Sequence, residues 1–196
     1  GPTGIGCFAD DQLVRVRDAA TPRSVRELRV GDVVQSTVAD EWSEVYFVYA
    51  HRAEARVLQI ELEEHHSSLS LTPLHLVLVA ECGENERDCA APRWMTAESV
   101  RAGRDWLLVD GGQRRAVRAV NERRSSVRYV LTRSDSIVVN GVQCSVHVLR
   151  HRLFSWLTLP LRWISSAGLL SKQSVRPAEW LIEAIDRRLF ALLTAL

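Results

Sequence analysis

The chain has 196 residues, a formal net charge of +1 and an isoelectric point near 7.9, a balance that gives no general attraction for nucleic acid. Apolar residues make up 46% and charged residues 25%, which is typical of a globular protein with one core, or one domain and an appendage. No apolar run approaches the roughly 18 residues that a membrane-spanning helix needs.

The first residues predict an upstream segment. The sequence opens Gly-Pro-Thr-Gly-Ile-Gly without Met, so we expect the chain to come from a larger precursor whose remaining part can carry any targeting signal. Residues 1–6 are therefore interpreted as the end of that upstream segment.

Residues 7–148 have the pattern of an all-β domain. Short runs rich in Val, Leu, Ile and Tyr recur at close spacing between polar residues and glycines. The expected strands are Leu13–Arg17, Val33–Ser36, Val45–Ala50, Arg56–Leu62, Leu69–Leu71, Leu76–Ala80, Trp106–Val109, Ala116–Glu122, Tyr129–Thr132 and Ile137–Val139.

A weak internal repeat lies within this β region. Ser24–Val34 resembles Thr96–Leu108, and each copy reads as a short helical turn that ends at a glycine and launches a strand. The two glycines, Gly31 and Gly103, are 72 residues apart (103 − 31). This spacing predicts two related β subdomains in one fold.

The four cysteines show no Cys-x-x-Cys pair, so no metal site is expected. Cys82 and Cys89 bracket a short polar loop. They can form a local disulfide across a hairpin in an oxidising compartment, and two separate thiols are an equally good interpretation.

Residues 149–196 differ in character from the β region. Pro160 bends or ends any helix in the apolar segment His151–Ile164, residues 165–176 read as a linker, and Pro177–Leu196 has the apolar spacing of a helix. Residues 150–196 hold seven Lys/Arg and three Asp/Glu, a net charge of +4. They also hold Trp156, Trp163 and Trp180, a combination typical of segments that lie at a membrane surface.

Two short motifs carry candidate chemistry, and each is weak alone. In Gly6–Phe8, Cys7 reads by default as a buried structural cysteine. Leu71–His75 places the Thr72 hydroxyl and the His75 imidazole three residues apart around a proline turn, so both side chains can point at one spot. A capped turn with a hydrogen-bonded histidine has the same pattern.

The order of the motifs is far more specific than either motif. The Cys-Phe start at Cys7 is followed by Leu28–Val34, Leu-Thr-Pro-x-His-Leu-Val from Leu71, Gly103, and Leu-Thr-x-x-x-x-Ile-Val-Val-Asn from Leu131. This series resembles the Hint family shared by hedgehog C-terminal domains and inteins, and specifically the hedgehog-type Hog domain, over roughly residues 6–165.

The resemblance implies a Hint fold of two pseudo-symmetric β subdomains and a self-cleaving activity. In that mechanism the Cys7 thiol attacks the carbonyl of Gly6, so an N-to-S acyl shift turns the scissile Gly6–Cys7 amide into a thioester. His75 gives a proton to the departing amine, and Thr72 orients the scissile amide. The upstream polypeptide is then the acyl donor in cis.

The resemblance also implies the acceptor. Inteins use a terminal His-Asn pair, which is missing from the end Leu193–Leu196, so splicing is not expected. Hog domains esterify the upstream chain to a sterol hydroxyl, and the segment from His151 resembles the start of their sterol-recognition region. We therefore expect a cholesterol-like sterol as co-substrate, no other cofactor, and contact with a membrane through a helical sterol-recognition-like tail at 149–196.

Two positions depart from the hedgehog pattern. The segment after Ser43-Glu44-Val45 is one residue longer, and His51 stands where the Asp base for the sterol is expected; a neutral imidazole can accept a hydroxyl proton. Ser145 aligns with the serine of the family's Ser-Cys pair, and Cys144 lies before it, two residues from the family's cysteine position at Val146 and on the same side of an extended strand. Cys144 can still approach Cys7 as a redox partner, and a plain buried cysteine is the alternative.

Three functions follow from these observations. The first is a monomeric, single-turnover protease and protein–sterol transferase in the secretory pathway, on the extracellular side or associated with the membrane. The second is a self-cleaving protease whose thioester passes to water or another small nucleophile. The third is a degenerate, non-catalytic extracellular module, against which the intact Cys7, Thr72 and His75 argue.

Overall fold

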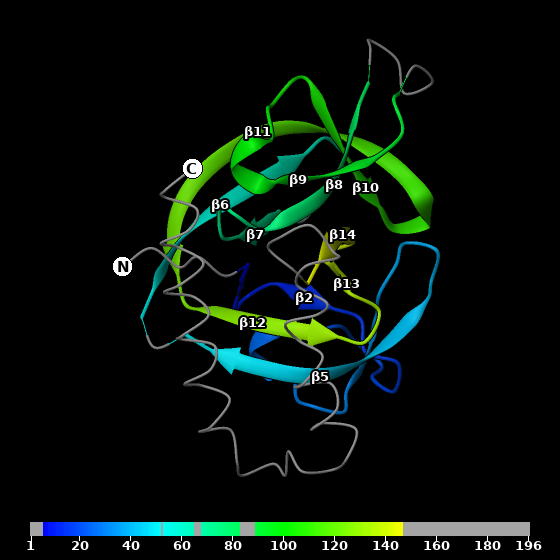
Figure 1. Cartoon of the computed structure of the whole chain (residues 1–196), viewed down its shortest axis with the longest axis vertical. Helices are drawn as coiled ribbons and strands as arrows, with labels where there is room; N and C mark the ends of the chain where they lie inside the picture. Colours follow the sequence, from blue (N-terminus) through cyan, green and yellow to red (C-terminus); the bar gives the residue numbers. More distant parts are fainter. Residues whose placement is uncertain (1–5, 52, 65–67, 83–88, 147–196) are drawn as a thin grey trace.

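The computed structural model describes residues 6–51, 53–64, 68–82 and 89–146 (Figure 1). The predicted tail at 149–196, with Trp156, Trp163 and Trp180, and most of the upstream segment lie outside the described residues. In the part described, no helix is long and apolar enough to cross a membrane.

The described residues form strands and three single-turn 3-10 helices, so the all-β prediction is confirmed. The helices are η1 (Val25–Glu27), η2 (Ala97–Ser99) and η3 (Asp110–Gly112). The strands are β1 (Phe8–Ala9), β2 (Leu13–Val14), β3 (Arg23–Ser24), β4 (Val33–Gln35), β5 (Trp42–Ala50), β6 (Ala55–Leu62), β7 (Leu69–Leu71), β8 (Leu76–Glu81), β9 (Arg93–Thr96), β10 (Asp105–Val109), β11 (Gln113–Ser125), β12 (Val127–Thr132), β13 (Ser136–Val139) and β14 (Val142–Ser145).

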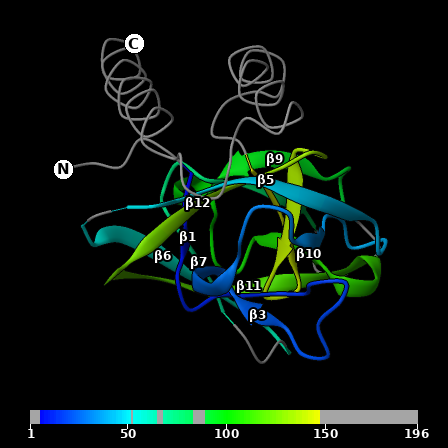
Figure 2. The ribbon, with the colours of Figure 1, turned by 90° about the horizontal axis from the view of Figure 1, so that it is seen from below.

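One antiparallel sheet contains all of these strands except β2 and β3, which pair with each other. Its order is β13-β14-β8-β10-β11-β6-β7-β1-β12-β5-β4, with β9 paired to β8. In Figure 1, β11 curves along the outer edge, and β5 and β12 lie side by side at the opposite end. Figure 2 shows β1 close to β12, its neighbour in the sheet. The two-residue β1, which follows Cys7, therefore lies between β7 and β12.

The internal repeat is a structural repeat. Each copy has a residue with extended backbone, Ser24 or Thr96, before a 3-10 helix, and a glycine with positive φ, Gly31 (96°) or Gly103 (73°), after it. The helices end at Glu27 and Ser99 rather than at the glycines, because the turn that needs positive φ comes later, just before the next strand. This corrects the predicted helix end and keeps the predicted glycine role.

The two halves exchange their long strands. β5 pairs first with β4 and then with β12, and β11 pairs first with β10 and then with β6. Both long strands bulge at matching points, because Tyr46 and Arg118 are each skipped in the pairing. The predicted subdomains are therefore interlocked through the same sheet.

The turn that carries Thr72 and His75 also occurs twice. The backbone N–H of His75 donates to Thr72 O (3.0 Å), and that of Gln12 donates to Ala9 O (3.2 Å). The carbonyls of His75 and Gln12 then accept from the first residues of η2 and η1, at 2.8 and 2.7 Å. In the turn from Ala9 to Gln12, Ala9 stands at the position of Thr72 and Gln12 at the position of His75.

Asn140 joins the turn from Ala9 to Gln12 to the rest of the fold. Its Oδ1 accepts from Leu13 N (2.6 Å), and its Nδ2 donates to Gln12 Oε1 (2.9 Å) and Ser68 O (2.7 Å). Asn140 has a φ of 47°, a region that Asn tolerates better than most residues.

Cys82 and Cys89 form a disulfide and face each other as a bridge pair in the hairpin between β8 and β9. Of the two interpretations left open by the sequence, the structure has the disulfide.

The observed strands differ from the predicted ones in two ways. β2 is shorter than the predicted strand Leu13–Arg17, and β1, β3, β9 and β14 were not predicted. β1 and β3 have two residues each, which is too short to show an alternating pattern.

Replacing Asn140 with Ala is expected to lower the free energy of unfolding by about 2–4 kcal/mol, because it removes three hydrogen bonds and leaves Ala at positive φ. Urea denaturation of the chain measures this change. Asn140→Gly removes the same hydrogen bonds without the backbone strain, so its loss should be smaller. A loss below about 0.5 kcal/mol for Asn140→Ala would mean that the side chain does not hold the two segments together.

Candidate active site

Three hydrogen bonds join Cys7 and Thr72, and the longest runs from Thr72 Oγ1 to Cys7 O (3.5 Å). The backbone N–H of Cys7 donates to Thr72 Oγ1 (2.9 Å), and the backbone N–H of Thr72 donates to Cys7 O (2.9 Å). The nitrogen of Cys7 belongs to the Gly6–Cys7 peptide bond, so Thr72 binds the amide that was predicted to be cleaved. Thr72 is fully buried and Cys7 is 3% exposed, so water competes little for these bonds.

Sheet pairing brings these two segments together although they are 65 residues apart. Phe8, the residue after Cys7, pairs with Leu71 of β7 on one side and with Arg128 of β12 on the other. Since β7 ends at Leu71, Thr72 is the first residue beyond the strand and lies beside Cys7.

His75 ends the same turn and is fully buried. Its Nε2 lies 2.7 Å from the carbonyl oxygen of Ser145, the last residue of β14. A carbonyl only accepts, so Nε2 carries a proton and any proton exchange with a reacting group falls to Nδ1. The imidazole also packs against Phe8, with 4.2 Å between ring centroids. These two contacts hold the ring in place.

The Ser145 carbonyl was not expected as the partner of His75. The sequence comparison aligned Ser145 with a family serine, but nothing in the pattern pointed to its backbone. The contact arises because β14 pairs with β8, the strand that begins directly after His75. A backbone acceptor of this kind leaves no residue-type signal in the sequence.

His51 lies at the end of β5 and is half-buried. Its Nδ1 is 2.9 Å from Ala53 O, and its backbone N–H donates to Val127 O (3.0 Å). β12 lies between β5 and β1, so the backbones of His51 and Cys7 are separated by at least two strand spacings, roughly 10 Å. The structure therefore brings together Cys7, Thr72 and His75, and places His51 two strands away.

Cys144 is fully buried on β14, opposite Val77 of β8 and Ile137 of β13. It is a free cysteine in this structure, and its thiol donates to Val142 O (3.6 Å). Burial raises the pKa of the Cys144 thiol, which disfavours the thiolate needed for disulfide exchange. These observations agree with a buried structural cysteine better than with a redox partner of Cys7.

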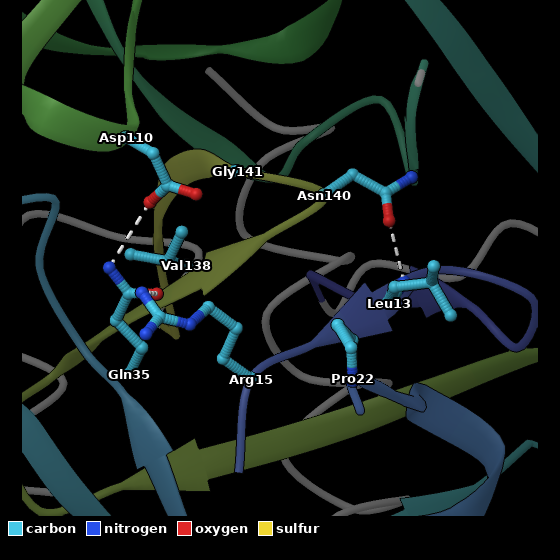
Figure 3. Close-up of a pocket in the computed structure, with 8 residues that line it drawn as sticks. All are labelled: Leu13, Arg15, Pro22, Gln35, Asp110, Val138, Asn140 and Gly141. Atoms are coloured by element: carbon cyan, nitrogen blue, oxygen red, sulfur yellow. Dashed lines mark hydrogen bonds between the residues drawn. The ribbon is translucent and has the colours of Figure 1, made fainter. Parts of the chain in front are cut away.

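A pocket of about 230 Å³ lies elsewhere on the fold (Figure 3). Within it, Asp110 accepts a hydrogen bond from Gln35 Nε2 (3.1 Å). None of Cys7, Thr72, His75 and His51 contributes to its lining, which is formed by Leu13, Arg15, Pro22, Gln35, Asp110, Val138, Asn140 and Gly141. Among residues 6–51, 53–64, 68–82 and 89–146, no group of three or more His, Cys, Asp or Glu side chains is placed to hold a metal ion.

Solved intein structures share this fold. The gp41-1 intein has a TM-score of 0.57 and 15% identity, with 71% of this chain and 98% of that chain covered. A DnaB intein from Synechocystis sp. PCC 6803 has a TM-score of 0.56 and 12% identity over 71% and 97%. A bacterial intein-like domain from Clostridium thermocellum has a TM-score of 0.54 and 16% identity over 71% and 97%.

No curated protein matches the chain in sequence. The family profile described as Hint module matches residues 3–183, which is most of the chain. The chain therefore belongs to the Hint module family of autoprocessing domains and has the all-β Hint fold that inteins share.

Proposed function

We propose that the chain is a Hog-type domain that cleaves the Gly6–Cys7 bond with Cys7 as nucleophile and transfers the upstream segment to a sterol. The observation that carries the cleavage step is the hydrogen bond from the Cys7 N–H to Thr72 Oγ1, because it fixes the scissile amide beside a buried histidine.

The first step is an isomerisation. A bond forms between the Cys7 sulfur and the Gly6 carbonyl carbon, the bond from that carbon to the Cys7 nitrogen breaks, and the thiol proton ends on the released amine. Gly6 has no side chain to crowd the attack. The product is a thioester and a free amino group on Cys7, and no other reactant is consumed.

Thr72 and His75 divide the work of amide cleavage. The Thr72 hydroxyl accepts from the scissile N–H and so fixes the orientation of the amide while its nitrogen becomes an amine. His75 supplies the proton to that amine through Nδ1, since its Nε2–H is held by the Ser145 carbonyl.

The second step transfers the acyl group from the Cys7 sulfur to the 3-hydroxyl of a cholesterol-like sterol. The Hog-like sequence pattern and the basic, Trp-containing segment 150–196 support this acceptor and a membrane surface as partner. His51 is the proposed base. A sterol bound against the face of the sheet, across β12, would bridge the two strand spacings that separate His51 from Cys7.

The Cys82–Cys89 disulfide supports an oxidising location, so we place the monomeric chain in the secretory pathway or outside the cell. The separation between His51 and Cys7 favours one alternative, in which the thioester is hydrolysed by water or passed to another small nucleophile. Release without sterol, at the rate seen with sterol, would favour that alternative.

Cys7→Ala is expected to abolish cleavage induced by dithiothreitol, because no thioester can form. Intact-mass spectrometry of the chain measures the loss of residues 1–6 over time. Normal loss of this segment in Cys7→Ala would show that Cys7 is not the nucleophile.

Thr72→Val removes the hydroxyl but keeps the shape of the side chain, and it should slow thiol-induced cleavage by about 10- to 100-fold, the rate equivalent of roughly 1.5–3 kcal/mol. Thr72→Ser keeps the hydroxyl and should stay within a few-fold of the unmodified chain. Equal rates for Val and Ser would mean that the hydrogen bond to the scissile amide does not contribute.

His75→Ala should block thiol-induced cleavage, whereas His51→Ala should leave it unchanged and slow only the release that depends on sterol. The two variants are compared with dithiothreitol alone and with cholesterol in detergent. If His51→Ala releases residues 1–6 with sterol at the unmodified rate, the base of the second step is another group.

Truncation after Val148 should keep thiol-induced cleavage, since Cys7, Thr72 and His75 all precede the cut, and should lose the sterol-dependent release. Burial of a few hundred Å² of sterol surface is worth several kcal/mol at roughly 25 cal/mol per Å², so removal of this surface would remove the acceptor from the site. An equal sterol response in both chains would place the sterol site within the β domain.

A further inference from the structure

A second side chain with an acidic proton lies beside Cys7. In the pairing of β1 with β12, Ala9 pairs with Val127 and Phe8 with Arg128. One step further along the same antiparallel register, Cys7 comes opposite Tyr129. Paired residues in adjacent strands have side chains on the same face, so the Cys7 sulfur and the Tyr129 ring lie on the same face of the sheet.

The Tyr129 hydroxyl is buried without a hydrogen-bond partner among the described residues. Tyr129 is 3% exposed, and its ring packs edge-on against Phe47, 6.3 Å away between centroids. An unsatisfied buried hydroxyl costs about 1–3 kcal/mol, and phenylalanine would fill the same space without that cost. A tyrosine here is therefore better explained by what its hydroxyl does during the reaction than by packing.

The hydroxyl stays protonated. Burial raises the pKa of Tyr129 well above its usual value, and the neighbouring Tyr46 on β5 and Cys7 raise this pKa further. The influence of Cys7 means that thiol and phenol share one buried region. At neutral pH the phenol is therefore a proton donor beside a sulfur that must become negative in order to attack.

We propose that the Tyr129 hydroxyl donates a hydrogen bond to the Cys7 sulfur while that sulfur is negatively charged, during the formation of the bond to the Gly6 carbonyl carbon. The proposal rests on the proposed cleavage at Cys7. Tyr129 keeps its proton throughout, so the balance of the step is unchanged: one carbon–sulfur bond forms, one carbon–nitrogen bond breaks, and the thiol proton ends on the amine.

In the part of the chain that the structure describes, the Tyr129 hydroxyl has no partner, so this hydrogen bond is not formed before the reaction. A neutral thiol is a weak acceptor, whereas a thiolate in a buried site is a strong one. The hydrogen bond therefore forms mainly in the transition state, which is the condition under which it raises the rate.

The test is Tyr129→Phe in the full chain, with the release of residues 1–6 by dithiothreitol followed by intact-mass spectrometry. The rate is expected to fall by about 10- to 100-fold. The thermal midpoint should stay the same or rise, since the unsatisfied hydroxyl is gone. The rising limb of the rate against pH should also move to higher pH, because the Cys7 thiolate loses a hydrogen-bond donor and its pKa rises. Among the described residues, the groups whose charge acts on Tyr129 are Tyr46 and Cys7.

Tyr49→Phe is the matched control, because Tyr49 pairs with Tyr129 across β5 and β12 and is farther from Cys7. It should leave the rate unchanged. A Tyr129→Phe chain that cleaves at the unmodified rate overturns the inference, and so does a slower chain whose thermal midpoint has dropped, since that result indicates a structural hydroxyl.

Failure of the proposed function has a different signature. If Cys7→Ala still releases residues 1–6, the nucleophile is wrong and the role of Tyr129 falls with it. If the unmodified chain cleaves, Cys7→Ala does not, and Tyr129→Phe is as fast as the unmodified chain, only the inference about Tyr129 is overturned.

Discussion

The reciprocal pair of hydrogen bonds between Cys7 and Thr72 is the contact on which the candidate site depends. The backbone N–H of each residue donates to the other residue, so neither segment can shift along the other without breaking both of these bonds. The sheet supports this pair, because β1 is held between β7 and β12. A two-residue strand has little stability of its own, and it is ordered here because both of its neighbours are longer strands of the same sheet.

The same backbone turn occurs twice among the described residues, and only one of the two copies carries the candidate catalytic side chains. The turn from Thr72 to His75 and the turn from Ala9 to Gln12 have matching backbone hydrogen bonds, and each leads to a matching 3-10 helix. The first has a hydroxyl and an imidazole that can act on an amide. The second has Gln12, whose side-chain oxygen accepts from Ser70 N and Asn140 Nδ2. One backbone geometry therefore carries the candidate catalytic residues in one half and a cohesive hydrogen-bond network in the other.

Burial affects the two thiols described here in different ways. Cys144 is enclosed by β8, β13 and β14 and donates to a carbonyl of its own strand, so burial only makes the thiol harder to ionise. Cys7 is almost as buried, but its neighbours include Thr72, which binds its amide nitrogen, and Tyr129, whose hydroxyl is unpaired. The low exposure of Cys7 limits access of water, and Thr72 gives its amide nitrogen the hydrogen bond that water would otherwise provide.

The sequence alone determined the family-level features of this protein. Its alternating apolar runs indicated β structure, the repeat around Gly31 and Gly103 indicated two related halves, and the order of Cys7, Thr72 and His75 indicated the site. These signals are readable because positive φ, strand alternation and side-chain chemistry each restrict the residue type at a position. The shortest strands gave no such signal, since two residues cannot show a period.

Only the tertiary structure decided which groups meet. The Ser145 carbonyl holds His75, the register of β1 and β12 brings Tyr129 opposite Cys7, and β12 separates His51 from the site, all through pairings between strands far apart in the chain. The structure also resolved the Cys82–Cys89 alternatives in favour of a disulfide. Strand order and register depend on how the two halves exchange β5 and β11, and a backbone carbonyl or a strand neighbour imposes almost no restriction on residue type. That is the physical reason why these contacts could not be read from the sequence.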